Sequence, residues 1–141
     1  MIDRRRLVLT VLALAFTRGA HAHSFTQGAI EIGHPWARPT AARDGAVYLV
    51  LATRGSSGDR LIGAATPLAE RVEIRDELGN PVDGFDILPK RPFALRPGRR
   101  FLALIGLKQA LTLGDSFPLT LRFRDAGDAA VTVMVETAPG D

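Results

Sequence analysis

The sequence predicts an all-β protein folded as a single Greek-key β-sandwich. Residues 117–123 and 131–136 alternate apolar and polar side chains, with the period of two that is typical of half-buried strands. Clusters of turn-forming residues, such as residues 54–59, 78–81 and 125–128, separate short apolar runs. No helical period is sustained along the chain, and short strands between frequent turns indicate two packed sheets.

The remaining strands follow from local patterns. Residues 46–52 (AVYLVLA) are apolar on both faces, as in a central strand, and residues 101–105 are similar. Around residue 73 the alternation predicts that Val72 and Ile74 point inward while Arg71, Glu73 and Arg75 point outward. Residues 108–113 form a crossover that the sequence leaves open as either helical or extended.

The first 22 residues have the pattern of a signal peptide. Three arginines (residues 4–6) precede an apolar run over residues 7–16, and Ala20-His21-Ala22 forms a small-x-small cleavage site. The apolar run is shorter than the roughly 20 residues that a membrane span needs, and no stop-transfer pattern follows to favour an uncleaved anchor. We therefore predict cleavage after residue 22, one domain over residues 23–141 without a transmembrane anchor, and a periplasmic location.

Charge and composition exclude several classes of function. The full chain has 18 basic and 15 acidic residues, and removal of residues 1–22 leaves fourteen of each, so nucleic acid is not expected as a partner. There is no cysteine, and therefore no disulfide, thiolate metal site or thiol nucleophile. The serines lack a Gly-x-Ser-x-Gly turn, no glycine-rich loop joins a strand to a helix, and the carboxylates are scattered. The sequence therefore predicts that the protein is not an enzyme.

Two blocks carry a family resemblance. They are residues 34–40 (HPWARPT) and residues 95–123 (LRPGRRFLALIGLKQALTLGDSFPLTLRF). Both resemble the exported copper chaperone family PCu(A)C, and the resemblance extends over roughly residues 28–135. It implies a cupredoxin-like or immunoglobulin-like sandwich. It also implies a copper-handling role, with a copper-receiving membrane oxidase or another periplasmic protein as the partner.

The positions at which this family places its copper ligands hold unsuitable residues. The family uses a histidine at the end of a strand, a methionine in the next loop and a His-x-Met pair after a Pro-Gly turn. The matching positions here hold Arg75, Phe101 and Ala103, and residues 76–88 contain no methionine. Copper(I) prefers thioether and imidazole ligands, whereas arginine stays protonated and offers no lone pair. We therefore do not expect copper(I) to bind at the family's site.

Two functional hypotheses remain. In the first, the protein is a copper-handling accessory that binds copper elsewhere, and His23 becomes a metal ligand because cleavage would give it a free amine beside its imidazole. In the second, the protein is a metal-free binding or interaction module whose basic residues Arg75, Arg99 and Arg100 form an anion-binding pocket. His34 and Met134 are expected to have structural roles rather than to bind metal.

Overall fold

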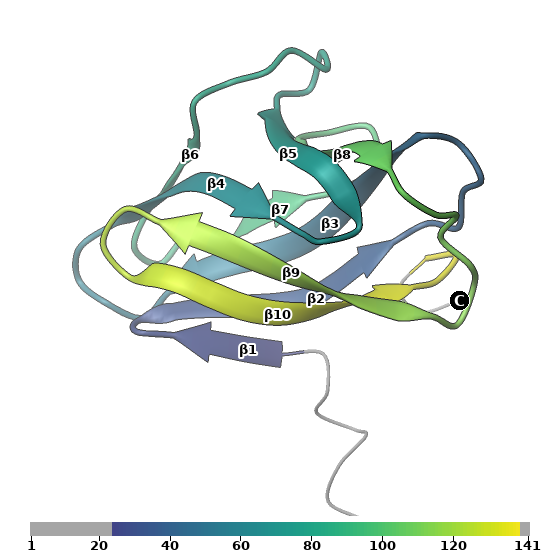
Figure 1. The fold of residues 1–141 in the computed structure, drawn as a ribbon. Coiled ribbons are helices and arrows are strands. Elements are labelled where there is room, and N and C mark those ends of the chain that lie inside the picture. The colour runs from purple at the N-terminus through teal and green to yellow at the C-terminus, as the bar shows by residue number, and fades with distance from the viewer. Residues whose placement is uncertain (1–23, 139–141) are drawn as a thin grey trace, which may run out of the picture.

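The computed structural model describes residues 24–138, and in this range the chain forms ten β-strands and no helix (Figure 1). The strands are β1 (Ser24–Gln27), β2 (Ile30–Ala37), β3 (Asp44–Thr53), β4 (Asp59–Ala65), β5 (Ala69–Arg75), β6 (Phe85–Ile87), β7 (Phe93–Leu95), β8 (Phe101–Leu107), β9 (Ser116–Phe123) and β10 (Gly127–Val135). The predicted all-β class is therefore confirmed. The predicted signal peptide, residues 1–22, and His23 lie outside the described residues.

The strands form one curled sheet with the order β5-β8-β3-β2-β10-β9-β4-β6, to which β1 adds beside β2 and β7 beside β3. The pairs are antiparallel except for β2 and β10, which run parallel with Met134 opposite Trp36. This parallel pair joins two halves that face each other. In Figure 1, β4, β9 and β10 lie in front of β2, β3 and β8.

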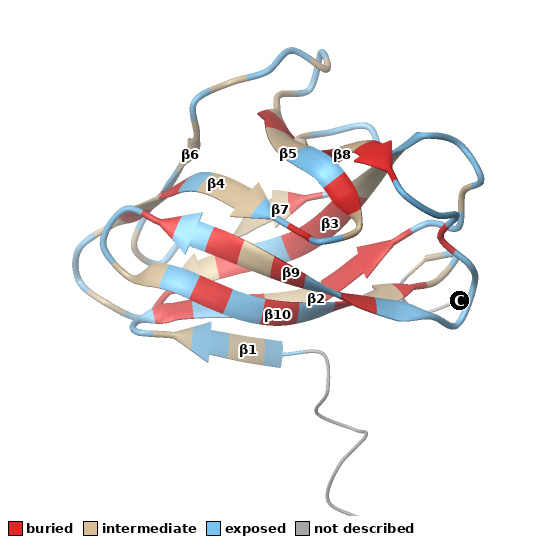
Figure 2. Ribbon diagram, in the orientation of Figure 1, coloured by how far each residue is buried: buried red, intermediate tan, exposed pale blue. Residues whose placement is uncertain are grey.

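The core lies between the two halves. On β9 the side chains of Phe117, Leu119, Leu121 and Phe123 are buried, and the exposed Arg122 lies between two of them. The red and pale blue bands along β9 and β10 in Figure 2 show this alternation directly. The residues with the period of two are thus the ones that form the core, as the sequence predicted.

Strand β3 contributes to the core with one face only. Val47, Leu49 and Leu51 are buried in the core cluster, whereas Val50 on the opposite face is 41% exposed. The sequence correctly predicted a strand here. The prediction that both faces of this strand are buried was wrong at Val50, which is exposed. The outer face of β3 therefore remains available to line a surface site.

The crossover over residues 108–113 contains no helix. The backbone of Leu111 exchanges two hydrogen bonds with Thr40, with N···O distances of 2.8 and 3.0 Å. This bridge holds the segment after β2 against the segment after β8. It thereby fixes Thr40 at the edge of the cavity described next.

Candidate functional site

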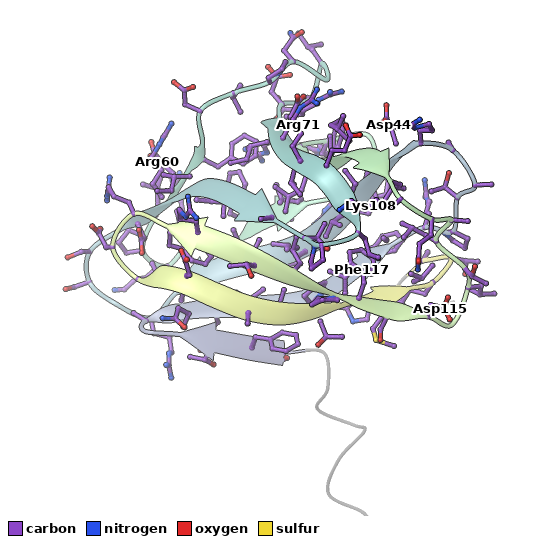
Figure 3. The ribbon with its side chains drawn as sticks, in the orientation of Figure 1. Asp44, Arg60, Arg71, Lys108, Asp115 and Phe117 are labelled. Carbon is purple, nitrogen blue, oxygen red and sulfur yellow. The ribbon has the colours of Figure 1, made fainter. Side chains whose placement is uncertain are left out.

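The three positions that differ from the family pattern lie together at one end of the sheet. Arg75 on β5 is the register partner of Phe101 on β8, and Ala103 lies two residues farther along β8. All three line a single cavity of about 270 Å³, which we call the cradle. Its other lining residues are Arg38, Thr40, Asp44, Gly45, Ala46, Tyr48 and Ile105. Asp44 and Arg71, both labelled in Figure 3, are register partners of Ile105 near the end of β8.

An ion cluster on β5 fixes one side of the cradle. Arg75 donates to Glu73 Oε1 from Nη2 at 2.7 Å and from Nε at 3.2 Å, and Arg71 Nε donates to Oε2 at 2.9 Å. These hydrogen bonds lower the pKa of Glu73 below its usual 4.5, and the contribution from Arg75 is the larger one. Arg71, Glu73 and Arg75 occupy every second position of β5 and share its outer face, as the sequence predicted.

The cradle does not fit a soft metal ion. Arg75 is a permanent cation, and Phe101 and Ala103 end in carbon. The remaining side-chain donors are oxygen atoms of Thr40, Asp44 and Tyr48, which copper(I) does not favour. Within residues 24–138, no group of three histidine or carboxylate side chains comes together in a way that could hold a metal ion.

A second arginine, Arg38, enters the cradle from the end of β2. Its guanidinium carbon lies 5.9 Å from the ring centroid of Trp36, which itself lies 4.9 Å from the ring of Tyr48. Burial raises the pKa of the Tyr48 hydroxyl, and the charge of Arg38 lowers it by less. No carboxylate of the described chain forms an ion pair with Arg38. Sequence reasoning missed this residue, although its spacing of two from Trp36 predicts the same face of a strand.

Arg99 and Arg100 do not line the cradle. The guanidinium of Arg100 stacks on Phe93, with its carbon 4.1 Å from the ring centroid. Its Nε lies 3.4 Å from Glu77 Oε1 without hydrogen-bond geometry. Arg99 is exposed in the turn before β8. The structure thus places Arg75 with Arg38 at the cradle, and anion binding by Arg99 and Arg100 stays a prediction.

His34 and Met134 lie on the neighbouring strands β2 and β10. The register of β2 shifts between Gly33 and Trp36, and His34 in this bulge has a left-handed φ of 47°. Its Nε2 lies 2.5 Å from Glu136 Oε1. His34 and Trp36 line the same groove, and Met134 is half-buried opposite Trp36. That His34 and Met134 have structural roles stays a prediction.

Solved structures share this fold. The chain is 23% identical to the apo PCuAC domain from PmoF1, with a TM-score of 0.77 over 82% of this chain and all of that domain. It is 24% identical to the copper-bound PCuAC domain from PmoF2, with a TM-score of 0.76 over 82% of this chain and 99% of that domain. At these identities the similarity establishes the fold, and the predicted cupredoxin-like architecture is confirmed.

The sequence itself matches one family over most of the domain. The family described as "Putative lipoprotein LpqE-like" matches residues 30–135. A curated relative, the "Putative lipoprotein Lxx21020" of Leifsonia xyli subsp. xyli, is 23% identical over 142 residues, covering 95% of this chain and 86% of that protein. With the family match spanning β2 to β10, the chain belongs to the LpqE-like family and has the fold of a PCuAC domain.

Proposed function

We propose that this protein is an exported binding domain that has the PCuAC fold but does not carry copper(I) in its cradle. One observation carries the proposal: Arg75, Phe101 and Ala103 meet in the cradle, and none of them is a ligand for a soft metal. Arg75 lines the cradle as a cation while it is paired with Glu73. We infer that the function is binding and that the cradle takes a ligand other than copper(I).

Export is the second part of the proposal. Residues 1–22 have the pattern of a signal peptide, and both the matching family and the curated relative are described as lipoproteins. Within the described residues there is no helix that could cross a membrane. The domain over residues 23–141 would then act in the periplasm.

A competition titration with a copper(I) chelator tests the cradle. The exported protein should leave copper(I) with the chelator, because the cradle offers no imidazole or thioether. The positive control is the triple variant Arg75→His, Phe101→His, Ala103→Met. Positions 75 and 101 are register partners with Cα atoms about 5 Å apart, and positions 101 and 103 share a face, so the new donors lie within reach of one ion.

The triple variant should gain measurable copper(I) affinity, and its site remains one ligand short of the family's set. Submicromolar copper(I) binding by the unmodified protein that disappears in Arg75→Ala would overturn the proposal. Binding that survives Arg75→Ala would direct attention to a site outside the cradle.

A second candidate function is copper handling at the N-terminus. It is favoured by the copper-bound PmoF2 domain of the same fold and by His23, which follows the predicted cleavage site. The amine and imidazole of a terminal histidine form a chelate for copper(II). A copper-receiving membrane oxidase or another periplasmic protein would then be the partner.

The test of this second function uses tag-free exported protein whose mass confirms His23 as the first residue. One alanine added before His23 displaces the amine, so copper(II) affinity should fall sharply. Equal affinity with and without the added alanine would exclude His23 as the site.

A further inference from the structure

The geometry of the cradle points to a specific ligand class: we propose that it binds a small monocarboxylate with an apolar body, and that Arg38 and Arg75 together hold the carboxylate. This inference rests on the proposed function, because it names the ligand that the copper-free cradle takes. Three features carry it: the state of the two arginines, the apolar walls, and the charge balance around the cavity.

Arg38 is available to bind an anion. No carboxylate of the described chain pairs with it, and it lines the cradle at the end of β2. The side chain is exposed, and its guanidinium carbon lies 5.9 Å from the ring centroid of Trp36. A guanidinium is planar and can bind a carboxylate through two parallel hydrogen bonds. Arg38 is thus the principal anion-binding residue.

Arg75 is held in place and still has donors to offer. Its Nε and Nη2 bind Glu73 Oε1, which accounts for two of the three nitrogen atoms of its guanidinium. A guanidinium carries five N–H groups, so those of Nη1 remain for a ligand. Because Glu73 fixes the plane of Arg75, these donors stay at the cradle, where Arg75 lines the wall. Arg75 therefore acts as the second, weaker contact.

The walls of the cradle are suited to an apolar ligand body. Ala46, Phe101, Ala103 and Ile105 line it with carbon, and the ring of Tyr48 adds an aromatic surface. The volume of about 270 Å³ lies below the ~300–1,000 Å³ of pockets for drug-sized ligands. A short branched or aromatic acid fits these limits, whereas a large ligand would extend into solvent.

The charge balance favours a single negative charge. The lining holds two positive charges, Arg38 and Arg75, and one negative charge, Asp44. Glu73 pairs with Arg75 but does not itself line the cavity. Asp44 Oδ1 accepts a hydrogen bond from the backbone N of Gly106 at 3.3 Å, which holds it near the end of β8. A dianion such as phosphate would be repelled by these groups more strongly than a monocarboxylate would.

Benzoate is the probe that tests this inference. In two-dimensional NMR spectra of the ¹⁵N-labelled exported protein, benzoate should shift the amide signals of Ala46, Phe101 and Ala103, with weaker shifts at higher salt. Benzyl alcohol, which has the same ring without the charge, and inorganic phosphate, which has charge without the ring, should each cause smaller shifts. N-acetyl-phenylalanine tested in parallel distinguishes a free small acid from the carboxylate of a chain end.

Matched arginine variants assign the contacts. Arg38→Gln should weaken benzoate binding about tenfold, as expected for loss of a charge-assisted hydrogen bond. Arg38→Lys should recover only part of it, because an ammonium cannot bind a carboxylate with a planar fork. Arg122→Gln removes the same charge at an exposed position on β9 that does not line the cradle, and it should leave benzoate binding unchanged.

Equal benzoate binding by wild type and Arg38→Gln, no shifts at the cradle, or tighter binding of phosphate than of benzoate would each overturn the inference. The copper(I) titration is independent of these results. Failure of benzoate to bind, with copper(I) still rejected, would remove the ligand class and leave the proposed copper-free cradle standing.

Discussion

A guanidinium and an imidazole at position 75 would make opposite demands on their surroundings. An imidazole can offer a lone pair to a metal, whereas a guanidinium brings a permanent charge that needs acceptors. Strand β5 supplies that acceptor two residues earlier, where Glu73 receives hydrogen bonds from both Arg71 and Arg75. The side chain at position 75 is thus stabilised by its own strand, with no ligand required.

This pairing predicts how Glu73 titrates. Arg75→Gln should raise the pKa of Glu73 towards 4.5, and Arg71→Gln should raise it less, because the hydrogen bond from Arg75 is the larger cause of the lowering. Carboxyl-carbon NMR titrations of the wild type and both variants would measure this order. Identical Glu73 titration curves in all three proteins would contradict it.

The same shift gives a pH dependence of stability. Because the pKa of Glu73 is lower in the folded state, its ionised form adds stability above the unfolded pKa, and this contribution is lost as pH falls through the folded pKa. Glu73→Gln should therefore be less stable than the wild type in urea at pH 7. The two proteins should converge as the solution becomes more acidic than pH 4.5. A difference that persists below both pKa values would have another cause.

At the scale of the strand, β4 is tied to the turn between β9 and β10 by the side chain of Asp59. Its carboxylate accepts backbone hydrogen bonds from Arg60, Asp125 and Ala126 at 2.7, 2.9 and 3.0 Å. The side chain is buried, with 7% exposure. These bonds satisfy backbone donors that the β9–β10 turn would otherwise leave unpaired. Asp59 is therefore a structural carboxylate.

Replacing this carboxylate should destabilise the domain. Asp59→Asn keeps the size but exchanges one acceptor oxygen for a donor, so unfolding free energy should fall by about 2 kcal/mol or more. Asp86→Asn is the control, because Asp86 makes an exposed ion pair with Arg60, and its loss should cost at most about 1 kcal/mol. Urea denaturation measures both. Equal losses would argue against the special role of Asp59.

The backbone at Gly58, just before β4, lies close to the backbone of β6, which predicts that a larger residue at position 58 is destabilising. A Cβ on Gly58 would lie 2.7 Å from the carbonyl oxygen of Ile87 in β6, so Gly58→Ala should destabilise the domain by about 1–3 kcal/mol. Gly63, within β4, has only the Cβ of Arg122 near, at 4.0 Å. Gly63→Ala should therefore be neutral or stabilising. Thermal unfolding that ranks the two variants in the reverse order would contradict the pairing of β4 with β6 as described.

For the whole molecule, removal of the N-terminal segment changes the charge. The full sequence has an isoelectric point of about 10.2, whereas loss of residues 1–22 leaves equal numbers of basic and acidic residues. Isoelectric focusing of the exported protein should therefore show a near-neutral band. Mass spectrometry of the same band should give the mass of a chain whose first residue is His23. A strongly basic band for the exported form would contradict cleavage after residue 22.

The sequence allowed prediction of local structure far better than of long-range contacts. The alternation at Phe117–Phe123 predicted its strand and buried face, because a period of two depends only on neighbouring residues. Arg38 could not be assigned to the cradle in the same way, because β3 must first bring β2 beside β8. Arg100 was expected beside Arg75, but Phe93 and Glu77 hold it elsewhere, through packing that no local pattern indicates.

The parallel pairing of β2 with β10 also sets the order in which this protein can become complete. Synthesis delivers the chain from its N-terminus, so β2 emerges long before its partner. Strand β10 occupies an interior position of the sheet, between β2 and β9. Strand β1 already pairs with residues 30–33 of β2, so until residue 135 is free the open part of this edge is the short segment of Trp36 and Ala37 that pairs with β10. A chain truncated before β10 therefore exposes this short edge together with the part of the core that Val131, Val133 and Val135 complete.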